Sequence, residues 1–306
     1  MPRARANDPL RTHANAPPGL TDKKMNDYIL TLSCPDRIGI VHSVTGWLLN
    51  LHGNIIDAQQ FGDLETERFF LRVHFHLPLP ADAAELERSF ASVANKFDME
   101  AQIYDAQRKA RLLILVSRQG HCLNDLLFRK HSGQLPVEIA GIVSNHGDFA
   151  AMAGSYGIPF YHLPVTPETR EAQEQQILDL VRKENVDLVV LARYMQILSN
   201  NLCQALSGKA INIHHSFLPS FKGARPYHQA HARGVKIIGA TAHYVTGDLD
   251  EGPIIEQDIE RVDHAMSARD LTQVGSDVES LVLSRAVRSH VEHRILLNGQ
   301  RTVVFR

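Results

Sequence analysis

Residues 111–117 read RLLILVS, an apolar run of strand length that ends in a serine, and similar runs recur along the chain. They return as VEIAGIVS at 137–144, IPFYHLPV at 158–165, VDLVVLAR at 186–193 and AINIH at 210–214. Segments with apolar residues at helical spacing separate these runs, and near-continuous apolar strands are typical of a parallel sheet covered by helices on both faces. We therefore predict a doubly wound, mostly parallel α/β domain.

The segment before this domain has a different order of predicted elements. Between residues 27 and 105 we expect strand, helix, strand, strand, helix, strand, with YILTLSCP at 28–35 and RFFLRVHFHL at 68–77 as two of the strands. IGIVHSVTGWLLNLHG at 38–53 has helical spacing and ends on a glycine, and a second helix is expected at 83–96. This split βαβ order is typical of the ferredoxin-like fold.

These patterns divide the chain into three parts. We expect a disordered tail at 1–24, because it is rich in proline and basic residues and poor in large apolar ones. A ferredoxin-like domain at 25–106 and an α/β domain at 110–306 follow, and the last helix of the chain is expected at about 268–294.

Composition excludes several classes of function. The chain has 306 residues and a net charge of −2, which gives no indication of binding to nucleic-acid phosphates or anionic lipid. Its three cysteines are widely spaced and odd in number, which favours a reducing compartment over a disulfide framework. No apolar run reaches the roughly 18 residues of a membrane span. We expect a cytoplasmic protein with no nucleic-acid or membrane partner, and organelle targeting by the tail is the alternative.

Three polar residues stand where a ligand of a doubly wound sheet would bind, outside the carboxyl ends of its strands. Side chains alternate along a strand, so Asn212 and His214 project to the same side at the end of AINIH. Asp250 lies in a glycine-bordered loop from which a carboxylate can enter the same crevice. An amide, an imidazole and a carboxylate together can activate water and polarise a carbonyl. Each also has a structural explanation, as a turn former, a core histidine and a turn acid.

A metal site is the alternative use of the histidines. His228 and His231 are three residues apart and could share a helical face, with a third ligand from His214, His215 or His243. Histidines at this spacing on a helix are usually solvated, so we predict no metal.

The turn SRQGHCLN at 117–124 argues against a nucleotide cofactor. A dinucleotide fingerprint needs several glycines for its tight turn and for close approach of the pyrophosphate, and only Gly120 is present. We therefore expect neither NAD nor ATP as a cofactor.

Two long stretches carry a resemblance to a known family. INIHHSFLPSFKGARPYHQA at 211–230 and GVKIIGATAHYVTGDLDEGPIIEQD at 234–258 closely resemble the formyltransferase fold family that uses 10-formyltetrahydrofolate, and within it the formyltetrahydrofolate deformylases. The catalytic residues of that family fall on Asn212, His214 and Asp250. The resemblance implies a pterin-binding segment and a loop that closes over it, formed by Arg193, Tyr194, Met195, Gln196, Ile197 and Leu198, and by Val245, Thr246, Gly247 and Leu249.

The resemblance implies hydrolysis of 10-formyltetrahydrofolate to formate and tetrahydrofolate, which would supply formate for purine biosynthesis and balance one-carbon pools. Asn212 and His214 would donate to the formyl oxygen, Asp250 would position the water, and His214 is the nearest group that could carry a proton to N10 of the folate. No cofactor is implied, because the folate is the substrate. Formyl transfer to an amine such as glycinamide ribonucleotide is the alternative, but the turn at 117–124 departs from the glycine-rich phosphate loop of those transferases.

A second resemblance concerns the first domain. LSCPDRIGIVHSVTGWLLNLHGNI at 32–55 resembles an ACT domain, a regulatory module that binds amino acids. The resemblance implies an amino-acid effector at Asp36, Arg37 and Gly39. A purely structural or oligomerising module is the alternative, and we expect a homo-oligomer.

Overall fold

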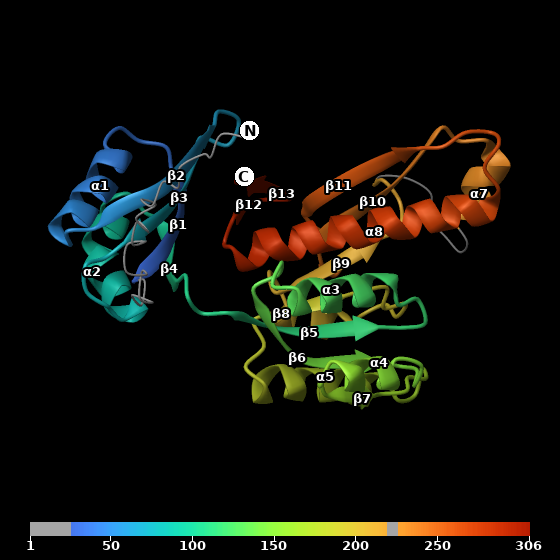
Figure 1. Ribbon diagram of the computed structural model, residues 1–306. Coiled ribbons are helices and arrows are strands. Elements are labelled where there is room, and N and C mark those ends of the chain that lie inside the picture. The colour runs from blue at the N-terminus through green and yellow to red at the C-terminus, as the bar shows by residue number, and fades with distance from the viewer. Residues whose placement is uncertain (1–25, 219–225) are drawn as a thin grey trace, which may run out of the picture.

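The computed structural model describes residues 26–218 and 226–306. The disordered tail expected at 1–24 lies outside the described residues. Figure 1 shows two α/β units connected near residue 106, and the larger sheet of each unit is formed from one continuous segment of the sequence.

The first unit is a four-stranded antiparallel sheet with two helices on one face. Its elements are β1 (Asp27–Pro35), α1 (Ile40–Asn50), β2 (Asn54–Asp63), β3 (Arg68–His76), α2 (Ala83–Lys96) and β4 (Glu100–Asp105). The strand order is β2-β3-β1-β4. Helix α2 begins after Asp82, whose side chain accepts hydrogen bonds from the N–H groups of Ala84 and Glu85. The predicted order of elements is confirmed.

The second unit contains a seven-stranded sheet covered on both faces. Its elements are β5 (Ala110–Val116), α3 (His121–His131), β6 (Val137–Ser144), α4 (Ala150–Ser155), β7 (Phe160–His162), α5 (Arg170–Lys183), β8 (Leu188–Leu191), α6 (Asn200–Ala205), β9 (Ala210–His214), α7 (Pro226–Arg233), β10 (Ile237–Tyr244), β11 (Ile254–Arg261) and α8 (Ala268–Val291). The strand order is β11-β10-β9-β8-β5-β6-β7.

Strand direction in this sheet confirms the predicted class. β5 to β9 pair in parallel, whereas β10 is antiparallel to both β9 and β11. The chain enters at β5, proceeds outward to β7 and then returns to β8 on the other side of β5. Such a reversal of strand order leaves a crevice at the carboxyl ends of the strands, which is where ligands of doubly wound sheets bind.

The apolar strands form the core on both faces of this sheet. Leu112, Ile114 and Val116 pack on the α3 and α8 side, whereas Leu113 and Leu115 pack on the opposite side with Ile177 of α5. All five β5 side chains are fully buried. The near-continuous apolar run at 111–117 thus reflects burial of both faces.

The last helix ends earlier than expected, and a short hairpin that the sequence did not predict follows it. Helix α8 stops at Val291, His293 takes a left-handed φ of 52°, and β12 (Ile295–Asn298) pairs with β13 (Arg301–Val304). The hairpin contacts the first sheet, because Leu296 and Phe305 pack on Phe70 of β3. Strands of four residues are too short to give an alternation that can be recognised in the sequence.

Within 26–218 and 226–306, no helix combines the length and the apolar character that crossing a membrane requires.

Candidate active site

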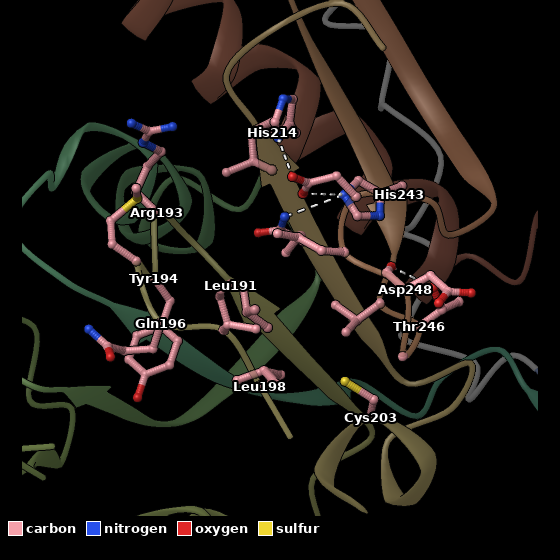
Figure 2. Close-up of a pocket in the computed structure, with 18 of the residues that line it drawn as sticks. Leu191, Arg193, Tyr194, Gln196, Leu198, Cys203, His214, His243, Thr246 and Asp248 are labelled. Atoms are coloured by element: carbon pink, nitrogen blue, oxygen red, sulfur yellow. Dashed lines mark hydrogen bonds and ion pairs between the residues drawn. The ribbon is translucent and has the colours of Figure 1, made fainter. Parts of the chain in front are cut away.

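A cavity of about 320 Å³ lies at the carboxyl ends of β8 and β9, and we call it the first cavity. Every residue predicted for the catalytic and pterin-binding sets lines it, which places them together although their chemical roles stay predictions. Six further lining residues had not been assigned to either set from the sequence: Leu191, Cys203, Ile213, His215, His243 and Asp248. Figure 2 shows the segment from Arg193 to Leu198 on one side of this cavity and His214 and His243 on the other.

Asp250 lies between two imidazoles at the wall of the first cavity. Its Oδ2 is 3.2 Å from Nδ1 of His214, and its Oδ1 is 3.6 Å from Nε2 of His243. Burial by itself would raise the pKa of this carboxyl group, but the interactions with the two histidines outweigh burial and hold the pKa of Asp250 well below its usual range. Asp250 is therefore a fixed negative charge near neutral pH.

The partners of His214 assign the position of its proton. A carboxylate only accepts hydrogen bonds, so Nδ1 of His214 donates to Asp250. The opposite nitrogen, Nε2, then accepts in the neutral ring, and the hydroxyl of Ser216 lies 2.9 Å from it. The imidazole thus has its basic nitrogen on the side away from Asp250, in the arrangement of a base oriented by a carboxylate.

His243 controls the orientation of the Asn212 amide. Nδ1 of His243 is 2.9 Å from the carbonyl oxygen of Tyr244, which only accepts, so Nδ1 carries the proton. Nε2 of the neutral ring then accepts from Nδ2 of Asn212 at 3.3 Å. An amide NH₂ has two hydrogens, and this contact uses one and leaves the other available to a ligand in the cavity.

The backbone around Asp250 has little freedom. Asp250 itself has a left-handed φ of 58°, a conformation that aspartate tolerates better than most residues. A Cβ at Gly252 would lie 1.7 Å from the carbonyl oxygen of Tyr244, the same oxygen that accepts from His243. Only glycine fits there, so packing against β10 requires Gly252 in this loop.

Residues 193–198 form the opposite wall, and β5 holds their backbone in place. The N–H of Ser117 donates to the carbonyl of Arg193 at 3.1 Å, and the Ser117 hydroxyl accepts from the N–H of Met195 at 2.9 Å. Tyr194 is buried beneath this wall, with its hydroxyl 2.7 Å from the amide of Gln173. Met195 and Ile197 are 58% and 63% exposed, so apolar side chains stand at the mouth of the first cavity.

The side chain of Arg193 turns away from the first cavity toward a buried carboxylate. Its Nε is 2.7 Å from Oε1 of Gln119 and 3.3 Å from Oε2 of Glu279. Glu279 also contacts Nε2 of His121 at 2.7 Å and the hydroxyl of Tyr227 at 2.5 Å. Burial would raise the pKa of Glu279, but the hydrogen bond from His121 and the charge of Arg193 lower it overall.

These groups line a cavity of about 440 Å³, which we call the second cavity. The second cavity is lined by Ser117, Arg118, Gln119, His121, Asn145, His146, Arg193, Met195, Gln196, His215, Tyr227, His228, Thr272, Ser276 and Glu279. Arg193, Met195, Gln196 and His215 line both cavities, so the two adjoin.

One group among residues 26–218 and 226–306 has the composition of a metal site. Ligand atoms of His121, Cys122 and Glu279 lie within 4.8 Å of one another. Burial raises the pKa of the Cys122 thiol, and His121 and Glu279 are already joined by a hydrogen bond, so these donors are satisfied as they stand. His228 and His231, considered for zinc from the sequence, do not belong to this group.

The predicted effector residues lie in the turn between β1 and α1. Gly39 has a φ of 96° at the N-terminus of α1, and Arg37 forms an exposed ion pair of 3.0 Å with Asp98. A small cavity of about 90 Å³ lies against α1, β2 and β3, but Asp36, Arg37 and Gly39 do not line it.

Comparisons with known proteins agree with this geometry. The formyl transferase family profile matches residues 110–287. The chain is 51% identical to the formyltetrahydrofolate deformylase of Corynebacterium sp., over 91% of this chain and 98% of that protein. It is 40% identical to the Escherichia coli K12 deformylase, over 90% of this chain and 97% of that protein.

Solved structures of a deformylase and of a transformylase match this chain to different extents. The formyltetrahydrofolate deformylase of Burkholderia mallei superposes with a TM-score of 0.88 at 51% identity, covering 92% of this chain and all of its own. Glycinamide ribonucleotide transformylase 1 of Symbiobacterium toebii has a TM-score of 0.60 at 30% identity and covers 65% of this chain. The deformylase match is long enough to include residues of both sheets, and the chain therefore belongs to the formyltetrahydrofolate deformylase family.

Proposed function

We propose that the protein hydrolyses 10-formyltetrahydrofolate to formate and tetrahydrofolate. The observation that carries this proposal is the cluster of Asn212, His214 and Asp250 at the wall of the first cavity, where an amide, an imidazole and a carboxylate lie together. Membership of the deformylase family supports the same reaction. The activity would release formate for purine biosynthesis and return tetrahydrofolate to the one-carbon pool.

His214 is the group we assign to the proton transfers. Because Nδ1 donates to Asp250, Nε2 is the basic nitrogen, and it can take a proton from the attacking water when the Ser216 hydroxyl rotates its hydrogen away from Nε2. The resulting imidazolium is stabilised by Asp250, whose charge is already in place. This assignment differs from the sequence-based expectation that His214 donates to the formyl oxygen, because a neutral ring with this tautomer has no proton at Nε2.

Asn212 is the group we assign to the developing oxyanion. The water oxygen bonds to the formyl carbon, and the carbonyl oxygen becomes negative and accepts from the second hydrogen of the Asn212 amide. The bond from carbon to N10 then breaks, and His214 returns its proton to N10. The products are tetrahydrofolate and formic acid, which ionises to formate. His243 takes no proton in this scheme and acts by orienting Asn212.

We assign the pterin to the space between the two walls of the first cavity. Residues 193–198 offer backbone groups and exposed apolar side chains on one side, and Val245, Thr246, Gly247 and Leu249 form the loop on the other. Leu249 is 58% exposed, which suits a contact that is completed only when folate is bound. No metal or cofactor takes part in the proposed chemistry.

Transfer to an amine is the weaker candidate because of the turn after β5. A Cβ at Gly120 would lie 2.4 Å from Cε1 of Phe149, so an aromatic ring packs directly on the single glycine of this turn. A phosphate cradle needs consecutive backbone N–H groups open to the ligand. Water is therefore the acceptor that we propose.

We further propose that the protein acts in the cytoplasm as a homo-oligomer. The thiols of Cys34, Cys122 and Cys203 are free and buried, as suits a reducing compartment. Strand β2 is an edge of the first sheet and exposes Ile56 and Phe61, so a second copy could pair with it. Light scattering should give a mass above that of one chain, and a monomer at assay concentrations would exclude this.

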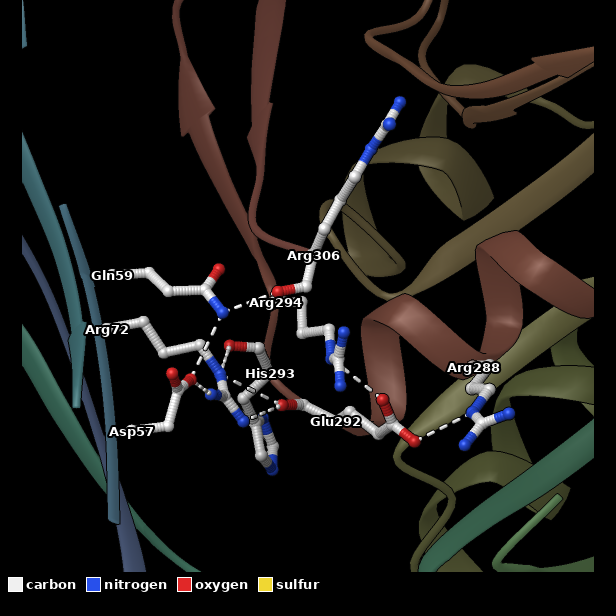
Figure 3. A network of polar contacts seen from close by, with 8 residues as sticks. All are labelled: Asp57, Gln59, Arg72, Arg288, Glu292, His293, Arg294 and Arg306. Carbon is white, nitrogen blue, oxygen red and sulfur yellow. Dashed lines mark hydrogen bonds and ion pairs between the residues drawn. The ribbon is translucent and has the colours of Figure 1, made fainter. Parts of the chain in front are cut away.

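We also propose that an amino-acid effector binds the first domain and regulates the enzyme. Contacts between this domain and the end of α8 would transmit the effect of binding to the second domain. Figure 3 shows Arg72 of β3 reaching the end of α8, where it donates to the carbonyls of Glu292 at 3.0 Å and His293 at 3.1 Å. The ring of His293 stacks on Tyr104 of β4 with centroids 3.5 Å apart. The first domain thus contacts the C-terminal end of α8, the helix on which Glu279 lines the second cavity.

The proposed reaction is tested by formate release from 10-formyltetrahydrofolate with no acceptor and with a strong chelator present. We expect turnover under both conditions, and added glycinamide ribonucleotide should not divert the formyl group, because the turn at 117–124 has no phosphate cradle. Transfer to that amine faster than formate release would establish the transferase instead. Loss of activity on chelation, restored by one metal, would require a metal in the mechanism.

Asp250→Asn should lower turnover by about 10² or more, because an asparagine cannot stabilise the imidazolium of His214. Tetrahydrofolate affinity, measured by calorimetry, should change little. Asp98→Asn is a matched control, since Asp98 also has a left-handed φ, of 54°, but lies far from the cavity on the exposed surface. Near-normal turnover by folded Asp250→Asn would remove Asp250 from the mechanism.

Arg72→Met should remove the hydrogen bonds from β3 to the end of α8 and abolish any response of the turnover rate to amino acids. Two half-buried carbonyls would lose their donor, which costs roughly 1–3 kcal/mol of unfolding free energy. Denaturant unfolding and turnover with each amino acid added are the measurements, and Arg88→Met on the exposed face of α2 is the control. If no amino acid binds the unaltered protein or changes its rate, the first domain is structural.

A further inference from the structure

The second cavity is not explained by the folate, because only three of the predicted pterin-binding residues, Arg193, Met195 and Gln196, reach it and all of them also line the first cavity. The second cavity reaches the carboxyl ends of β5 and β6 through Ser117 and Asn145, and it adjoins the first along four shared residues. Once folate fills the first cavity, the second cavity still offers space beside the reacting centre. Whatever else the reaction consumes or releases has room there.

His215 forms part of the boundary between the two cavities. Its ring lies against that of His214, with centroids 4.7 Å apart and planes inclined by 22°. The two residues are consecutive at the end of β9, so the one assigned to proton transfer and the one at the boundary are held by the same backbone. A molecule in contact with His215 therefore lies close to the base.

The ring of His215 has an unsatisfied nitrogen. Its Nε2 is buried and has no hydrogen-bond partner among the residues that the structure describes. Buried polar atoms in native proteins nearly always have a partner, and a bound water is the usual one when no protein group is present. His74 and Arg294 also have such atoms, but neither lines the first or the second cavity.

The surroundings of His215 keep its ring neutral. Burial lowers the pKa of His215 to about 4, and the charges of Arg193 and of His214 act in the same direction. Glu279 and Asp250 act in the opposite direction without reversing the shift. A neutral imidazole has one nitrogen that accepts and one that donates, so it can orient a water molecule without taking its proton.

We propose that His215 holds the hydrolytic water beside His214, and that the second cavity supplies this water and receives the formate that leaves. The proposal rests on the hydrolysis proposed above and assigns the place of its second substrate. Arg118 and Arg193 line this cavity, and the carboxylate of Glu279 is already shared by three donors, which suits the passage of a small anion.

The water held by His215 gives one proton to Nε2 of His214 while its oxygen bonds to the formyl carbon. The carbon–N10 bond breaks, the proton passes from His214 to N10, and the new carboxylic acid loses its remaining proton to solvent. His215 is unchanged throughout, so it needs no pKa near neutrality. Its contribution is the orientation of the water.

The test replaces His215 by a ring of similar shape without nitrogens and by a small side chain. His215→Phe and His215→Ala should each lower the rate of formate release by at least about tenfold, with tetrahydrofolate affinity within about twofold of the unaltered protein. Added imidazole should restore the rate of His215→Ala several-fold, because it can enter the vacated space beside the second cavity. Imidazole should not restore His215→Phe, where that space is filled.

A matched control is His131→Phe at the end of α3, which lines neither cavity and should leave the rate unchanged. Near-normal formate release by folded His215→Phe overturns the proposal, as does an equal loss of folate affinity and turnover without rescue by imidazole. These outcomes differ from failure of the proposed function, which would be absence of formate release in the unaltered protein.

Discussion

The half-buried carboxylate of Asp250 is the group on which the geometry of the site depends. It is the acceptor for Nδ1 of His214, and this contact decides which nitrogen of that ring is basic. Its second oxygen faces His243, which in turn orients Asn212. Partial burial of an ionised carboxylate is costly unless a donor compensates for the lost water, and Nδ1 of His214 is such a donor.

Two features of the β9 and β10 strands make this arrangement possible. Their antiparallel register pairs Asn212 directly with His243, so the two side chains stand on the same face of the sheet. His214 lies two residues beyond Asn212 and shares that face. The loop then returns Asp250 to this face, which requires the left-handed conformation of Asp250 and the close approach of Gly252 to Tyr244. Backbone shape and chemistry are therefore specified by the same few residues.

The sequence was sufficient for the elements whose patterns are local. Apolar runs predicted the strands of the large sheet, and alternation along AINIH placed Asn212 and His214 on one face. His243 was missed as a partner of Asn212, because their contact depends on the register between β9 and β10, which a single strand does not encode. Glu279 was missed for a similar reason: it reads as one acidic residue on a long amphipathic helix.

The contacts between the two units were likewise beyond local patterns. Arg72 alternates with apolar residues in β3 and has the appearance of a solvent-facing position, yet it is 6% exposed because the end of α8 covers it. The hairpin at 295–304 and the residue after it supply Leu296 and Phe305 to cover Phe70. Each of these residues is explained only when segments more than 200 positions apart are brought together.

Glu279 has a structural role that parallels that of Asp250. Arg193 has a left-handed φ of 64°, a conformation disfavoured for a long side chain, and it persists because its guanidinium is fixed by Glu279 and its carbonyl by Ser117. The backbone of residues 193–198 continues directly from that strained residue. One wall of the first cavity is thus tied to a buried carboxylate on α8, as the other is tied to Asp250. The first domain contacts the end of α8, so a change in that domain could displace the helix. The displacement would act through Glu279 on residues 193–198 before it acted on the catalytic residues. Regulation through this route would therefore change folate affinity first.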